Sequence, residues 1–177
     1  MNQQEQASQD GIADRTERRL QEIDPTTLTP LVRDALGRDT VEVVDWEHQR
    51  LRGGAGVGGS VYRLTGTGQE GDQVVPWSLI LKVICDPAYT DGARAVFDRA
   101  DPSAPFYWKR EPLAYRSGLL QDLPGGLCAP RCFGVIEHPG EAVWLWLEEV
   151  ADRFDGKWPL EHYGVVARHL GQLNGAY

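Results

Sequence analysis

A run of glycines near residue 55 restricts the possible folds of this chain more than any other feature. The stretch LRGGAGVGGSVYRL, residues 51–64, holds five glycines within seven residues. Glycine loses more conformational freedom on folding than any other residue, so this density is costly unless the backbone must follow a path closed to side chains. Gly54, Gly56 and Gly59 have the G-x-G-x-x-G spacing of a dinucleotide fingerprint. Together with Val61 they also match a G-x-G-x-x-G-x-V loop that covers nucleotide phosphates.

The elements expected around the glycines decide between these motifs. Apolar alternation and β-branched or aromatic residues predict strands over 41–46 and 49–54 before the cluster, and over 61–65 and 77–84 after it. A dinucleotide fingerprint needs a helix directly after its glycines, because the pyrophosphate binds at the N-terminus of that helix. A glycine loop between two antiparallel strands is instead the kinase arrangement, in which backbone amides cover the triphosphate. We expect this second motif, and a merely flexible hairpin turn is the alternative.

Helices and further strands follow from the same kinds of pattern. Thr29 can cap a helix, Pro30 suits a first helical position and Gly37 is placed to end one, so a short helix is expected there. The later patterns predict a helix over 108–120, strands over 130–136 and 143–147, and a helix over 158–177. The 143–147 strand is apolar on both faces, as expected in the middle of a covered sheet.

Composition and charge exclude several classes of protein. The chain has 177 residues, of which 41% are hydrophobic and 25% charged, as in globular proteins. Its net charge of −8 argues against nucleic acid and against an anionic membrane as partners. The sequence shows no apolar run of the signal-peptide or membrane-spanning kind. Its three cysteines lack a second pair of ligands at metal-site spacing, so we expect free thiols and a cytoplasmic protein.

Two charged residues, Lys82 and Glu111, are candidates for an ion pair of the kind found in the kinase arrangement. Lys82 lies in the apolar run LILKVI and by alternation shares a face with Ile80 and Ile84. Burying an ammonium group without a partner is costly, so Lys82 must reach water or an anion. Glu111 is a candidate partner, because Pro112 fits only in the first turn of a helix and so places Glu111 near the helix start. A solvent-facing lysine and an ordinary first-turn glutamate are the simpler alternatives.

The order of these features resembles the N-terminal part of an aminoglycoside phosphotransferase-like protein, within the protein-kinase-like fold shared with choline kinases. The resemblance covers about residues 28–177 and rests on GGAGVGGSVYRL, WSLILKVI, YWKREPLAYRSGLLQDLP, APRCFGVIE, VWLWLEEV and WPLEHYGVVARHLGQLNGAY. It implies an α+β fold: a kinase-like N-lobe, made of a five-stranded antiparallel sheet with one packed helix, then a hinge and the first helix of a truncated C-lobe.

The resemblance also implies a site for ATP or GTP with Mg²⁺. The glycine loop would cover the phosphates, Lys82 would hold them, and Glu111 would orient Lys82. The backbone of residues 148–150 would bond the adenine as the hinge. The residues implied in nucleotide binding are Gly54, Gly56, Gly58, Gly59, Ser60, Lys82, Glu111, Glu148 and Val150.

The residues that perform phosphoryl transfer in that family are missing from this chain. Transfer needs an aspartate that orients the acceptor hydroxyl, and an Asn and an Asp that hold Mg²⁺. In the family these come from a His-Gly-Asp-x-x-x-x-Asn loop and a later Asp. None of the four histidines begins such a loop. We therefore expect no catalytic residue and no metal ligand within this chain.

The expected organisation is a flexible arm over 1–27, a lobe over 28–147, a hinge over 148–157 and a helix over 158–177. An apolar stripe at helical spacing predicts self-association through the last helix; it consists of Leu160, Tyr163, Ala167, Leu170, Leu173 and Tyr177. Two functions remain open. One is the nucleotide-binding portion of a small-molecule kinase that phosphorylates a hydroxyl of an aminoglycoside-like or other small substrate. The other is a non-catalytic nucleotide-binding or interaction module.

Overall fold

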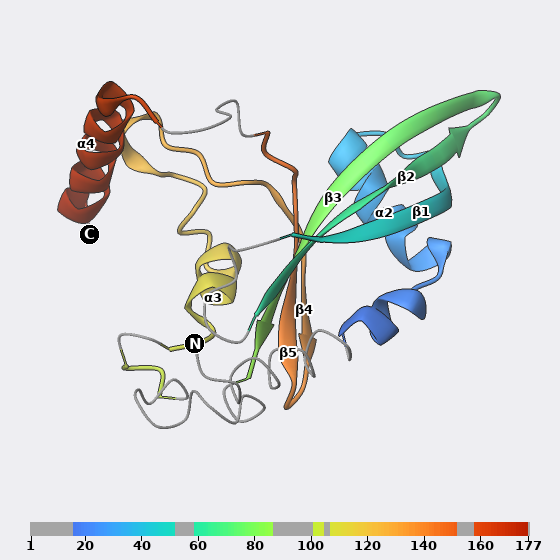
Figure 1. Cartoon of the computed structure of the whole chain (residues 1–177), viewed down its shortest axis with the longest axis horizontal. Helices are drawn as coiled ribbons and strands as arrows, with labels where there is room; N and C mark the ends of the chain where they lie inside the picture. The colour runs from blue at the N-terminus through green and yellow to red at the C-terminus, as the bar shows by residue number, and fades with distance from the viewer. Residues whose placement is uncertain (1–15, 52–58, 87–100, 105–106, 152–157, 177) are drawn as a thin grey trace.

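The computed structural model of the chain describes residues 16–51, 59–86, 101–104, 107–151 and 158–176. Their centre is one five-stranded antiparallel sheet in the order β1-β2-β3-β5-β4, with helices on both faces (Figure 1). The strands are β1 (Glu42–Leu51), β2 (Ser60–Glu70), β3 (Gln73–Cys85), β4 (Cys132–His138) and β5 (Ala142–Leu147). The helices are α2 (Pro25–Leu36), α3 (Arg110–Arg116) and α4 (Leu160–Ala176), with a 3-10 turn η3 (Pro124–Gly126). The predicted α+β fold with a five-stranded antiparallel sheet is confirmed.

Strands β2 and β3 form a hairpin that extends well beyond β4 and β5 (Figure 1). β3 pairs with β2 from Gln73 to Val83 but with β5 only from Ile80 to Cys85. Within the described part of the chain, the earlier part of β3, which includes Pro76, therefore has a strand partner on one side only. A strand tolerates proline at such an edge, which explains why β3 begins ahead of the predicted 77–84. The two strands expected over 41–46 and 49–54 are one strand, β1, with an irregularity between Val43 and Asp45.

The two faces of the sheet bury separate apolar clusters. Leu79, Leu81 and Val83 are fully buried on the face that packs against α2. Ile80 and Ile84 point to the opposite face and pack with residues of β5 and with side chains on and beside α3. All six residues of β5 are buried, because both of its faces are covered. The predicted alternation around Lys82 and the doubly apolar strand are both confirmed.

Helix α2 begins earlier than the sequence predicts. Asp24 caps it by accepting a 2.9 Å hydrogen bond from the Thr27 backbone N–H, and Pro25 occupies the first turn. Pro30 thus lies inside the helix, and the Thr29 hydroxyl donates to the Pro25 carbonyl instead of capping. Aspartate caps a helix better than threonine, which selects the earlier start. The predicted end is confirmed, since Gly37 closes the helix with φ 64.

Residues 16–21 are helical, within the segment 1–27 that the sequence predicts to be a flexible arm. Leu20 is fully buried in the cluster on the α2 face. Arg19 donates to His138 Nδ1 at 2.7 Å and forms an ion pair with Glu141, so it ties this segment to the hairpin of β4 and β5. Packed structure therefore starts ahead of residue 28, and residues 1–15 lie outside the described part.

Acidification below about pH 6.5, the ordinary pKa of histidine, should destabilise the fold. Burial lowers the pKa of His138, and the positive charge of Arg19 lowers it further against an opposing effect of Glu141. Between the ordinary and the lowered pKa the unfolded chain binds more protons. The contribution of His138 to stability is therefore complete above about pH 6.5 and is lost as the pH falls toward the lowered pKa.

Urea unfolding at about pH 7.5 and about pH 5.5 measures this effect, because the unfolding midpoint reports the free energy of unfolding. The His138→Gln variant should lose less stability than the native chain between the two conditions, because glutamine keeps a hydrogen-bond acceptor but does not titrate. An equal loss in both proteins would show that other groups cause the pH dependence.

Helix α4 lies away from the sheet and contacts η3 (Figure 1). Its partly buried positions are His162, His169 and Leu173. The predicted apolar stripe is largely open: Leu160 is 86% exposed, and Tyr163 and Leu170 are each more than half exposed. Tyr177 lies outside the described residues. Self-association through this helix remains a prediction.

No helix within the described ranges is long and apolar enough to cross a membrane.

Candidate functional site

Lys82 and Glu111 form an ion pair on the α3 face of the sheet. The Lys82 Nζ lies 2.9 Å from Glu111 Oε1 and 2.7 Å from Oε2. The lysine side chain is 20% exposed and the glutamate 38% exposed, so the pair lies at the edge of the apolar cluster and stays open to water. The predicted contact between these two residues is confirmed.

The strand register places Lys82 beside the end of the glycine-rich segment. Lys82 pairs with Val61 of β2 on one side and with Leu145 of β5 on the other. Leu51, the last residue of β1, pairs with the same Val61. Both ends of the segment between β1 and β2 therefore lie level with Lys82, one on the neighbouring strand and the other one strand further away. Gly54, Gly56 and Gly58 lie outside the described residues, so their own placement stays a prediction.

Ser60 takes a position that the sequence does not foresee. It pairs with Val83 and is 4% exposed, on the face that packs against α2. Alternation puts Lys82 on the other face. The Ser60 side chain is therefore not brought together with Lys82, and from Gly59 and Ser60 only backbone groups can reach a ligand on that side.

Helix α3 carries Glu111 in its first turn, with the buried Pro112 directly after it. This is the position that the proline predicts. The helix spans seven residues and not the expected 108–120, because the chain takes a left-handed conformation at Gly118, with φ 78. Glu137 of β4 accepts from Lys109 and from Arg116, at the two ends of the helix. These two bonds lower the pKa of Glu137 and fasten α3 to the edge strand.

Tyr115 belongs to the same site and is not among the residues predicted from sequence. Its side chain packs with the cluster on the α3 face. Burial and the nearby negative charge of Glu111 raise the pKa of Tyr115 to about 12, so its hydroxyl remains protonated at neutral pH. The signal was available in the sequence, since residues four apart lie on one face of a helix. Tyr115 stands four residues after Glu111.

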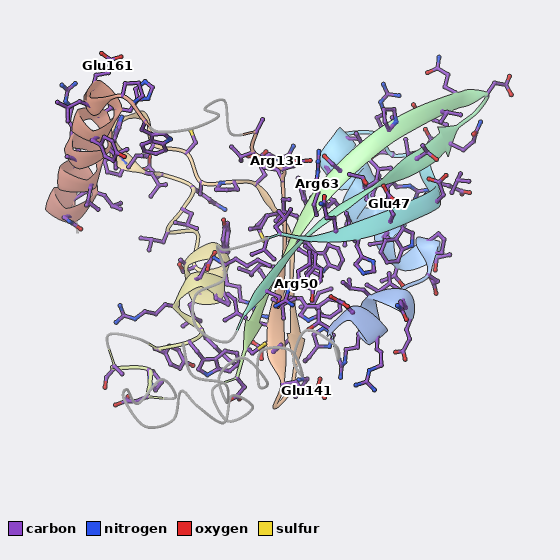
Figure 2. All side chains as sticks on the ribbon, viewed as in Figure 1. Glu47, Arg50, Arg63, Arg131, Glu141 and Glu161 are labelled. Atoms are coloured by element: carbon purple, nitrogen blue, oxygen red, sulfur yellow. The ribbon has the colours of Figure 1, made fainter. Side chains whose placement is uncertain are left out.

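The segment after β5 is held to the lobe by polar contacts. The Glu148 backbone N–H donates to the Arg131 carbonyl at 2.9 Å. The Glu149 carboxylate lies 2.9 Å from Arg63 Nε, and Figure 2 shows Arg63 on β2. Val150 is 64% exposed. Glu148 and Val150, both predicted site residues, thus lie on a segment outside the sheet, beyond the end of β5.

A pocket of about 530 Å³ lies beside this segment. Its wall is shared by the end of α2, the middle of β2 and β3, Phe133, Glu148 and Glu149. Lys82 and Glu111 do not line it. This pocket and the predicted phosphate-binding pair are therefore separate features, with only Glu148 common to the pocket and the predicted site.

The described residues contain no group of three or more His, Cys, Asp or Glu side chains placed to hold a metal ion. Comparison with known proteins gives no assignment, since no family model, no curated protein and no solved structure matches the chain. The geometry of the site is therefore the basis on which its function is inferred.

Proposed function

We propose that this chain is the nucleotide-binding lobe of a small-molecule kinase, which transfers the γ-phosphate of ATP or GTP to a hydroxyl group. The observation that carries the proposal is the Lys82–Glu111 ion pair, which lies level in the sheet with both ends of a glycine-rich connection. In kinases a strand lysine paired with a helix glutamate holds the nucleotide phosphates, and a glycine loop covers them. The acceptor is proposed only as a small molecule with a free hydroxyl.

The chemistry of the pair supports this role. A lysine ammonium has three N–H donors, and two at most are used by the two oxygens of Glu111. The third can donate to a phosphate oxygen. Glu111 restricts the rotamers of Lys82 before any ligand arrives, so less side-chain entropy is lost on binding. An ordered ammonium, together with the backbone N–H groups that the glycine-rich segment is proposed to supply, is a suitable partner for a polyanion, in spite of the net charge of −8.

Replacing Lys82 by Met should weaken nucleotide binding about tenfold to a hundredfold, because a hydrogen bond to a charged group contributes about 1.5–3 kcal/mol. Calorimetric titration of the full chain with ATP and with GTP, each with Mg²⁺, measures the dissociation constants. Glu111→Gln should have a smaller effect in the same direction, since the ammonium is then kept but no longer oriented.

Arg38→Met is the control for this experiment. It removes one cation from an ion pair with Glu70 at the other end of the sheet, away from Lys82. We expect it to bind nucleotide as the native chain does. Equal affinity in the native chain and Lys82→Met, or no binding by the native chain at millimolar nucleotide, would overturn the proposed function.

A further inference from the structure

The segment that follows β5 has little to hold it in place. β5 ends at Leu147, opposite Ile80, and residues 148–151 continue without a strand partner. Glu148 and Glu149 border the 530 Å³ pocket. Among the hydrogen bonds and ion pairs of the described residues, two tie it to the lobe: the Glu148 N–H to Arg131, and Glu149 to Arg63.

Arg63 is placed to hold this segment from across the sheet. It pairs with Ile80, which pairs with Leu147, so the three residues form one row over β2, β3 and β5. The Arg63 side chain crosses β3 to meet Glu149, two residues beyond that row. A residue of β2 thus contacts the chain two residues after it leaves β5.

We propose that Arg63 is a positioning residue: its ion pair with Glu149 fixes the course of residues 148–150 beside the pocket. The inference extends the proposed function, in which the backbone of this segment bonds the base of the nucleotide. Arg63 touches neither base nor phosphate in this role. It acts through Glu149, by keeping the backbone groups of the segment in one orientation before a nucleotide binds.

The chain offers a matched control for this pair. Arg38, which follows α2, forms another Arg–Glu pair with Glu70 of β2, at 2.8 Å and with side chains 43% and 27% exposed. The corresponding values for Arg63 and Glu149 are 2.9 Å, 44% and 25%. Arg38→Gln therefore removes an interaction of the same chemistry and the same solvent exposure, but not the contact to the segment after β5.

Hydrogen exchange of the native chain, Arg63→Gln and Arg38→Gln tests the proposal without any ligand. We expect the Glu148 amide, which is hydrogen-bonded to Arg131, to exchange up to about fivefold faster in Arg63→Gln, which corresponds to the upper range for a partly exposed ion pair. Its exchange should be unchanged in Arg38→Gln. Urea midpoints of all three proteins show that each is folded. Equal exchange in the native chain and Arg63→Gln, or the same acceleration in Arg38→Gln, would overturn the proposal.

Titration with ATP then separates this inference from the proposed function. Arg63→Gln should raise the dissociation constant about twofold to fivefold. The charge-swapped double variant, Arg63→Glu with Glu149→Arg, should restore both the affinity and the slow exchange. Unchanged affinity in Arg63→Gln contradicts the positioning role. If the native chain binds no nucleotide, the proposed function fails, and the exchange experiment still decides whether Arg63 holds the segment.

Discussion

Replacing Gly66 by alanine is expected to destabilise the fold by about 3 kcal/mol, at the upper end for an overpacked interior. A Cβ at Gly66 would lie 2.7 Å from Trp77 Cζ2 and 2.9 Å from Trp46 Cα, and would also meet the Asp45 carbonyl oxygen. Two of these three atoms belong to the backbone of β1. They cannot rotate away, so β1 and β2 would have to separate where they pair.

Urea unfolding followed by circular dichroism measures the loss. Gly164→Ala in α4 is the control, because a Cβ there meets no atom within 4 Å and alanine is the better helix former. It should leave the unfolding midpoint unchanged or raise it. A midpoint for Gly66→Ala within error of the native value would show that β1 does not lie against β2 in the described register.

Replacing Leu81 by alanine is expected to cost about 3 kcal/mol of unfolding free energy. Leu81 is fully buried and pairs with Tyr62 on β2 and Trp146 on β5, both of which are also buried. The loss of free energy has two causes. The removed methyl and methylene groups no longer gain from burial, and a cavity remains because three packed strands and α2 cannot move in to fill it. The measurement is again the urea midpoint at fixed pH.

Val74→Ala provides the comparison on the same strand. Val74 is 66% exposed, on the part of β3 that extends beyond β5, and its truncation should change stability by less than about 0.5 kcal/mol. A similar loss for both variants would contradict the described burial. Leu81 and Lys82 are neighbours on opposite faces, so Leu81→Ala should lower stability with little effect on nucleotide affinity, and Lys82→Met should do the reverse.

The sheet could be predicted from the sequence because its signals are local. Apolar alternation in β3 and the doubly apolar β5 determine which residues face which cluster. Element limits were less accurate, for identifiable reasons. The polar stretch in the middle of β1 suggested a break, but an edge strand can keep polar residues in extended backbone. Because Asp24 caps α2, this helix starts earlier than the sequence predicts. Because the chain is left-handed at Gly118, α3 ends earlier than predicted.

The site was predictable where one residue type constrains its neighbours. Pro112 located the helix start and hence Glu111, and alternation put Lys82 on the face that α3 covers. Pairs far apart in the chain give no such signal. The sequence holds 18 basic and 26 acidic residues, and nothing local selects Arg63 with Glu149 from their combinations. Only the register across three strands brings these two together.

The side of β3 that has no strand partner in the described part of the chain bears on how copies of the protein behave at high concentration. An unpaired strand edge presents free N–H and C=O groups. Two such edges can pair edge to edge and so build larger sheets or fibres. Pro76 stands exposed in that part of β3 and has no N–H to offer. The proline therefore interrupts the row of N–H donors that an incoming strand would need. In this way it protects against aggregation at the part of β3 that extends beyond β5.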